Sequence, residues 1–94
     1  MKQTRTVTRT LKVNNRLGLH ARPASLLAKT AAKYDADITL SKEDGSDIDA
    51  KSITGVLMLA AVQGTELQIR AEGDDAAEAV DALEQLIKSN FGEE

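Results

Sequence analysis

The sequence predicts an α+β fold: a two-layer open-faced sandwich in which a four-stranded antiparallel sheet carries three helices on one face. Four short segments alternate apolar and polar residues, as strands with one buried face do. Three other segments repeat apolar residues every three or four positions, as helices do. The segments follow one another in the order βαββαβα. The 94 residues suffice for a single domain, which we expect to span residues 1–94.

The first predicted strand covers residues 6–13, in which Val7, Leu11 and Val13 share one face. Arg9 interrupts this face with a charge. We therefore expect the strand to be frayed at its start or to lie at an edge of the sheet.

Three further segments are predicted to be strands. Residues 36–41 and 47–50 both alternate, and Asp44 and Gly45 between them are typical of a tight turn, so these two segments are predicted to form a hairpin. Residues 66–71 alternate most regularly and form the fourth predicted strand.

The first predicted helix covers residues 21–33 and has an apolar stripe at positions 24, 27, 28 and 31. Pro23 belongs in its first turn, where a missing N–H does no harm. A short second helix is predicted from an N-cap at Ser52 through Leu59. Its spacing places Met58 in the core.

The last predicted helix carries apolar residues at positions 76, 79, 80, 83 and 87. Gly92 is predicted to stop it. We expect Glu93 and Glu94 to form a solvated end, and the acidic residues between 43 and 49 to lie in a turn and on the solvent face.

The composition excludes several classes of protein. The chain has no cysteine, which excludes disulfides and thiolate chemistry and fits a reducing compartment. No apolar run is long enough to cross a membrane, and no signal peptide is predicted, so we expect a cytoplasmic protein without membrane insertion. A net charge of -3 argues against nucleic acid as a partner.

Residues 18–24 place the only histidine, His20, immediately before a predicted helix. The first N–H groups of a helix have no partner within it and lie at the positive end of its dipole, so they form an anion site. Here the backbone of Ala21 and Arg22 would supply those groups, and the Arg22 guanidinium adds a permanent charge. His20 would thus be a nucleophile beside a site for a phosphoryl group.

This arrangement suits phosphoryl transfer without a metal or other cofactor. A neutral imidazole attacks phosphorus well, and the resulting N–P bond is reactive in both directions. The surrounding donors stabilise charge on the phosphoryl oxygens. Pro23 would fix the helix start and Gly18 the approach of the preceding loop. No second ligand accompanies His20 at helical spacing, so no metal site is predicted. From the residues alone, an ordinary surface histidine remains the alternative.

The sequence Gly-Leu-His-Ala-Arg-Pro-Ala at 18–24 resembles the active-site signature of the HPr family, the histidine-containing phosphocarriers of the bacterial phosphotransferase system. Residues 51–56, Lys-Ser-Ile-Thr-Gly-Val, resemble the second motif of this family, around its regulatory serine. Residues 34–37 and 64–66 are also similar to family segments. The resemblance extends over roughly residues 6–90.

The resemblance implies a carrier, not an enzyme. His20 matches the histidine that accepts a phosphoryl group from Enzyme I and passes it to the IIA domains of sugar transporters. Arg22 matches the arginine that contacts the phosphate. Ser52 matches a serine that an HPr kinase/phosphorylase modifies in many relatives, although a plain N-cap role also explains a serine here.

The expected partner surface combines the exposed side of the first helix with the second helix. We expect Ser25, Lys29, Ile53, Thr54 and Leu57 to contribute. Thr54 stands where the family usually has a larger apolar residue, which weakens apolar burial there by about 1 kcal/mol. Core packing is the alternative for Ile53 and Leu57. Nothing in the sequence requires more than a monomer.

Three alternative functions stay open. Residues 15–18 and 90–94 also resemble the nitrogen-related branch, NPr, which works in a regulatory relay without sugar uptake; residues 51–53 and Gly55 favour HPr. A regulatory module that acts only through a phosphorylated Ser52 would not need His20. An unrelated module that binds a ligand or nucleic acid would need aromatic residues or a basic stripe on its sheet, and no predicted strand contains an aromatic residue.

Overall fold

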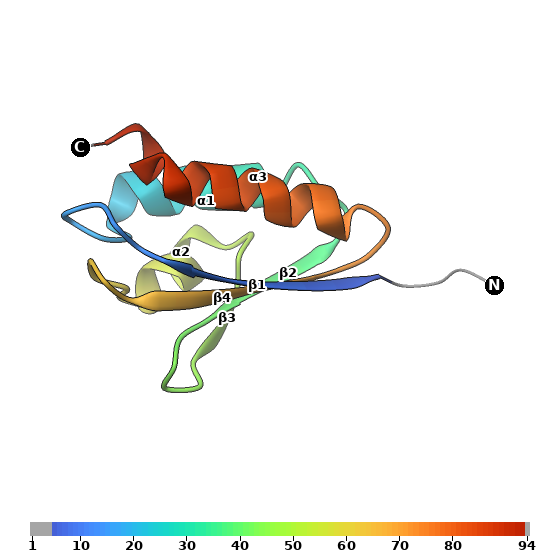
Figure 1. Ribbon diagram of the computed structural model, residues 1–94, viewed down its shortest axis with the longest axis horizontal. Helices are drawn as coiled ribbons and strands as arrows, with labels where there is room; N and C mark the ends of the chain where they lie inside the picture. Colours follow the sequence, from blue (N-terminus) through green and yellow to red (C-terminus); the bar gives the residue numbers. More distant parts are fainter. Residues whose placement is uncertain (1–4, 94) are drawn as a thin grey trace.

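The computed structural model describes residues 5–93 (Figure 1). Its elements follow the predicted order, with a short 3₁₀ turn added after the last helix. They are β1 (Thr6–Lys12), α1 (Ala21–Ala31), β2 (Asp37–Ser41), β3 (Asp47–Asp49), α2 (Ile53–Met58), β4 (Glu66–Glu72), α3 (Ala76–Lys88) and the turn η1 (Asn90–Gly92). The predicted α+β sandwich is confirmed.

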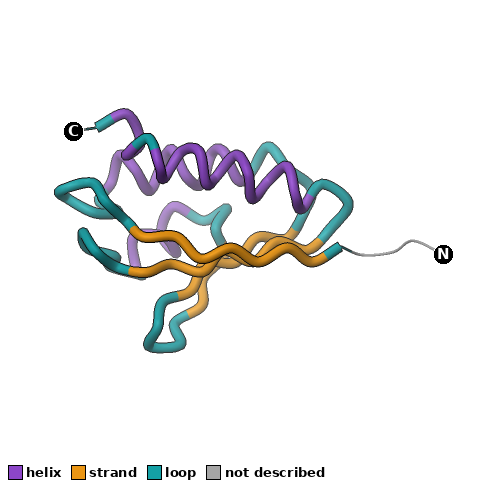
Figure 2. The backbone as a smooth tube through the Cα atoms, viewed as in Figure 1, coloured by secondary structure: helices purple, strands orange, loops and turns teal. Residues whose placement is uncertain are grey.

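The four strands form one sheet in the order β1-β4-β2-β3, and all neighbouring strands are antiparallel. Ile69 of β4 lies between Arg9 of β1 and Leu40 of β2. Figure 2 shows the sheet as one layer below the helices, with the β2–β3 hairpin extending beyond it. Because β1 is an edge strand, the expectation drawn from Arg9 is confirmed.

The core lies between the sheet and the helices and is almost entirely aliphatic. The sheet contributes alternate residues of β2 and β4, and the helices contribute their apolar stripes. The buried cluster includes Ile38, Leu40, Leu67, Ile69, Leu27, Val80, Leu83 and Ile87. Phe91 is the one aromatic residue among the fully buried side chains.

Arg9 lies on the helix-facing side of β1 because it pairs with α3. Its guanidinium donates to Glu84 and lies 3.3 Å from a carboxylate oxygen of Asp81. The two carboxylates satisfy a charge that would otherwise interrupt the apolar face, and they hold the edge strand to the helix above it.

Two expectations from the sequence are wrong. Met58, predicted in the core, is 75% exposed, because the short helix α2 turns Val56 and Leu59 inward and leaves the residues between them outside. The last helix ends at Lys88 rather than at Gly92. Asn90 and Phe91 follow with positive φ angles, both 56°.

No helix in residues 5–93 combines the length and the apolar character that crossing a membrane would require.

Candidate functional site

His20 is the N-cap residue of α1. Its backbone is extended, with φ -77° and ψ -171°, and its carbonyl accepts the first helical hydrogen bond, from the N–H of Ala24 at 2.9 Å. The side chain makes no capping hydrogen bond and is 34% exposed. The imidazole is thus available to a partner at the end of a helix whose first N–H groups, those of Ala21 and Arg22, have no partner within it.

Gly18 holds the preceding loop against the segment that follows α2. Its φ is +65°, and a Cβ atom there would lie 2.3 Å from the carbonyl oxygen of Ala61 and 2.8 Å from the Cα of Val62. The next residue, Leu19, donates its N–H to that same carbonyl at 2.9 Å. The predicted need for glycine at this approach is confirmed, and the contact sets the place of His20 two residues later.

A pocket of about 540 Å³ lies beside Glu93, the residue whose carboxylate contacts His20. It is lined by Arg16, Leu17, Arg22, Gly92 and Glu93. Among the residues that the structure describes, neither arginine has a carboxylate within 4.0 Å. The pocket therefore combines two guanidinium groups, which could bind an anion, with the carboxylate of Glu93.

The C-terminal segment brings a carboxylate to the histidine. The Nε2–H of His20 donates to the two carboxylate oxygens of Glu93 at 3.0 and 3.2 Å. Glu93 is only 16% exposed, so its prediction as part of a solvated end is wrong; Glu94 lies outside the described residues. The hydrogen bond from His20 lowers the pKa of Glu93 below its usual value, against desolvation, and Asn15 and Arg22 lower this pKa further.

Sequence reasoning missed Glu93 because its position depends on a turn that no local pattern predicts. After α3 the left-handed residues Asn90 and Phe91 reverse the chain, and the Phe91 ring is buried at 2% exposure. Gly92 follows with φ +74°. The only available signal was a large aromatic residue in a polar tail, which requires burial and so brings its neighbours back to the domain.

Ser52 is the N-cap of α2, as predicted. Its Oγ accepts the N–H of Gly55 at 3.0 Å, and its backbone carbonyl accepts the N–H of Val56 at 2.9 Å. The residue is half-buried. The capping role is confirmed, and phosphorylation of this hydroxyl stays a prediction.

The residues predicted for partner docking lie on two helices that pack together, α1 and α2. Ser25 is half-buried, whereas Lys29 and Thr54 are exposed. Ile53 and Leu57 are about 40% exposed, which excludes the alternative that they belong to the core.

Three other large apolar residues are exposed, and the sequence analysis did not predict them as part of the docking surface. They lie on α2, on the segment after it and in the loop before His20. Together with Ile53 and Leu57 they form what we call the apolar patch: Leu17, Ile53, Leu57, Met58 and Val62.

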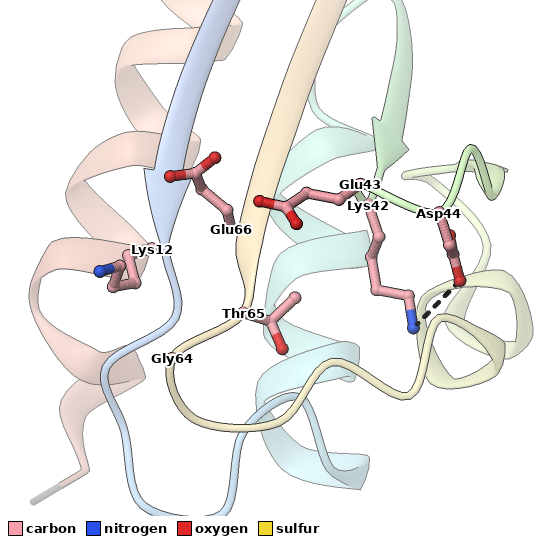
Figure 3. Close-up of a pocket in the computed structure, with 7 residues that line it drawn as sticks. All are labelled: Lys12, Lys42, Glu43, Asp44, Gly64, Thr65 and Glu66. Carbon is pink, nitrogen blue, oxygen red and sulfur yellow. Dashed lines mark ion pairs between the residues drawn. The ribbon is translucent and has the colours of Figure 1, made fainter.

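A second pocket, of about 430 Å³, opens at one end of the sheet (Figure 3). Charges of both signs line it, and the amine of Lys42 lies 3.8 Å from Asp44. It contains no histidine, cysteine or apolar floor. In the described part of the chain no three potential metal ligands cluster, in this pocket or elsewhere.

The chain is similar to known proteins over most of its length. Residues 7–89 match a family model described as the PTS HPr component phosphorylation site. Phosphocarrier protein HPr of Xylella fastidiosa is 44% identical over 84 residues, which cover 89% of this chain and 93% of that one. Phosphocarrier protein NPr of Klebsiella oxytoca is 36% identical over 89 residues, covering 95% and 99%.

The structural comparison gives the same result. A crystal structure of HPr from Thermoanaerobacter tengcongensis has a TM-score of 0.89 and 44% sequence identity, and the match covers 94% of this chain and 98% of that one. The fold and the family match define a phosphocarrier of the phosphotransferase system. The chain belongs to the HPr family.

Proposed function

We propose that His20 accepts a phosphoryl group from phosphorylated Enzyme I and donates it to IIA domains of sugar transporters. The observation that carries this proposal is the placement of a partly exposed imidazole at the N-cap of α1, close in sequence to Arg22 and to the first backbone N–H groups of the helix. The carrier is consumed and regenerated in the relay and needs no cofactor.

The geometry supports attack by one particular nitrogen. Nε2 is engaged with Glu93, and within the described residues Nδ1 makes no hydrogen bond. Nδ1 therefore carries the free lone pair that attacks phosphorus. The N–H groups at the start of α1 and the Arg22 guanidinium then stabilise the negative charge on the transferring oxygens.

The apolar patch supports docking of the partners. Its five exposed side chains lie in the loop before His20, on α2 and in the segment after α2, and exposed apolar residues that gather on a surface are typical of a protein–protein contact. Partners that bring acidic groups would meet Arg22 and Lys29 on α1. Thr54 contributes less apolar area than the larger residue usual in the family.

Ser52 suits a regulatory role on this surface. It directly precedes Ile53, a member of the apolar patch. A phosphate on the Ser52 hydroxyl would add about two negative charges beside side chains that must lose water on docking. We propose that such a modification, by an HPr kinase/phosphorylase, weakens transfer without unfolding α2.

The decisive experiment is phosphorylation with phosphoenolpyruvate and purified Enzyme I, followed by intact mass. We expect the wild-type chain to gain one acid-labile phosphoryl group and His20→Ala to gain none while keeping its circular dichroism spectrum. Uptake by folded His20→Ala would overturn the proposal.

The same assay separates the branches of the family. The higher identity to HPr than to NPr relatives favours the sugar-type Enzyme I as donor. Uptake only from a nitrogen-type donor would assign the chain to the regulatory relay. Failure with both donors would favour a binding module that acts through Ser52.

A further inference from the structure

We propose that Glu93 is a positioning residue for phosphoryl transfer: it holds the proton on Nε2 of His20, so that Nδ1 attacks, and it balances the positive charge that the ring gains. The inference rests on the proposed function of His20. It is carried by the contact between two residues 73 positions apart in the sequence.

The contact selects one tautomer of the imidazole. An ionised carboxylate can only accept hydrogen bonds, so both its oxygens, at 3.0 and 3.2 Å, require the proton to be on Nε2. In a neutral ring the other nitrogen, Nδ1, then holds the lone pair. Without Glu93 the proton would distribute between the two nitrogens, and part of the population would present the wrong atom.

Glu93 is itself held in place. The side-chain amide of Asn15, which is 1% exposed, donates to Glu93 at 3.0 Å and to the carbonyl oxygen of Gly18 at 2.7 Å. The same amide thus joins the carboxylate to the loop that positions His20. On the other side, the buried Phe91 anchors the turn two residues before Glu93. A group fixed from both sides is suited to orient another side chain.

The charges around the pair allow the carboxylate to stay ionised. Arg22 of α1 and Arg16 of the preceding loop line the same pocket, and no other carboxylate among residues 5–93 lines it. The pKa of Glu93 is lowered chiefly by the hydrogen bond from His20, and the charge of Arg22 lowers it further.

The charge balance of the transfer explains what Glu93 adds. The Nδ1 lone pair forms the new N–P bond as the bond between phosphorus and the donor atom of Enzyme I breaks, and that electron pair stays on the donor. The Nε2 proton remains in place, so the ring becomes a phosphorylated cation. The carboxylate faces that charge from the side opposite the phosphoryl group, as the aspartate of a Ser-His-Asp triad faces its imidazolium.

The test compares Glu93→Ala and Glu93→Gln with wild type, and uses Glu78→Gln as a control for loss of one negative charge at an exposed site on α3. Initial rates of uptake from phospho-Enzyme I are measured over a range of carrier concentrations. We expect kcat to fall at least about tenfold in Glu93→Ala with little change in KM, in line with the 10–100-fold losses found when the partner of a metal-ligating histidine is removed. Glu93→Gln keeps a hydrogen-bond acceptor but not the charge, so its kcat should lie between those of wild type and Glu93→Ala.

A second readout does not depend on transfer. The ¹⁵N NMR signals of His20 should show Nε2–H as the single neutral tautomer in wild type and in the control, and a mixture of tautomers in Glu93→Ala. Unchanged uptake rates and unchanged NMR signals in Glu93→Ala would overturn the inference. Faster uptake in this variant would also overturn it, because Glu93 would then be an inhibitor that occupies the anion site. If wild type takes up no phosphoryl group while the tautomers shift as expected, the proposed function fails and the contact between the two residues stands.

Discussion

His20 is the last non-helical residue before α1, so its backbone and its side chain serve different purposes. The extended backbone lets the carbonyl start the helix, while the imidazole remains outside it and partly exposed. Pro23 is buried in the first turn, where its missing N–H leaves no donor unpaired. The side chain that we propose as phosphoryl acceptor is thereby attached to the first turn of a helix that packs on the core.

Gly18 supplies a prediction at the scale of single residues. We expect Gly18→Ala to lower the free energy of unfolding by about 2–5 kcal/mol, since a Cβ costs about 1–2 kcal/mol in the left-handed region and overpacking adds about 1–3 kcal/mol. The added atom would meet the carbonyl of Ala61. Urea unfolding measures the loss, and phosphorylation of His20 should slow in the same variant.

Gly45→Ala is the matched control for this prediction. Gly45 also has a positive φ, +87°, but a Cβ there would meet nothing within 4 Å. In Gly45→Ala the free energy of unfolding should therefore fall only by the cost of the backbone strain. If the free energy of unfolding fell equally in the two variants, the close approach of Gly18 to Ala61 would not explain the destabilisation of Gly18→Ala.

At the scale of elements, the site is made where the start of α1 meets the end of α3. Neither helix alone brings together a histidine and a carboxylate. The turn after α3 uses two left-handed non-glycine residues, a conformation that persists only where surrounding contacts compensate for it. Burial of the Phe91 ring is that contact.

Phe91→Ala tests this compensation. We expect a loss of about 3–5 kcal/mol in the free energy of unfolding, which in a domain of this size lowers Tm by more than about 10 °C. The turn should also detach, so the His20 tautomer should shift as in Glu93→Ala. Leucine fills most of the space of the ring, so Phe91→Leu should lower the free energy of unfolding much less than Phe91→Ala. A stable Phe91→Ala with an unchanged tautomer would show that the backbone of the turn holds Glu93 by itself.

At the scale of the whole molecule, carboxylates join elements that are distant in sequence. Asp75, before α3, accepts the N–H groups of Asp35 and Ala36, each at 2.8 Å. Glu84 on α3 pairs with Arg9 of β1 and with Lys88. The N–H of Asp35 is the main cause of the lowered pKa of Asp75, and the hydrogen bond from Lys88 is the main cause for Glu84.

These shifts predict a dependence of stability on acid. A carboxyl group whose pKa is lower in the folded state stabilises the fold above its unfolded pKa of about 4, and this stabilisation is lost as pH falls through the folded value. The titration of these carboxyl groups should leave the urea midpoint nearly unchanged between about pH 7 and 5. Below about pH 4 the urea midpoint should decrease. Asp75→Asn should lower the midpoint at neutral pH and flatten the acid limb. An acid limb that is unchanged in this variant would contradict the role of Asp75.

Much of this architecture follows from local patterns in the sequence. The alternation in residues 66–71, the stripe in residues 21–31 and the caps at Ser52 and His20 depend on neighbours a few positions apart, and such patterns are determined by the chain alone. The same holds for the candidate acceptor, because a histidine followed by Ala-Arg-Pro already indicates a side chain placed at a helix start. The confirmed elements and their order are of this kind.

The tertiary structure alone decided the rest. The insertion of β4 between β1 and β2, the outward position of Met58 and the approach of Glu93 to His20 all depend on which distant segments pack together. No periodicity encodes such contacts, because their free energy comes from burying one surface against another that lies many residues away. The sequence by itself thus determined the elements and the candidate acceptor His20, and folding determined which carboxylate contacts it.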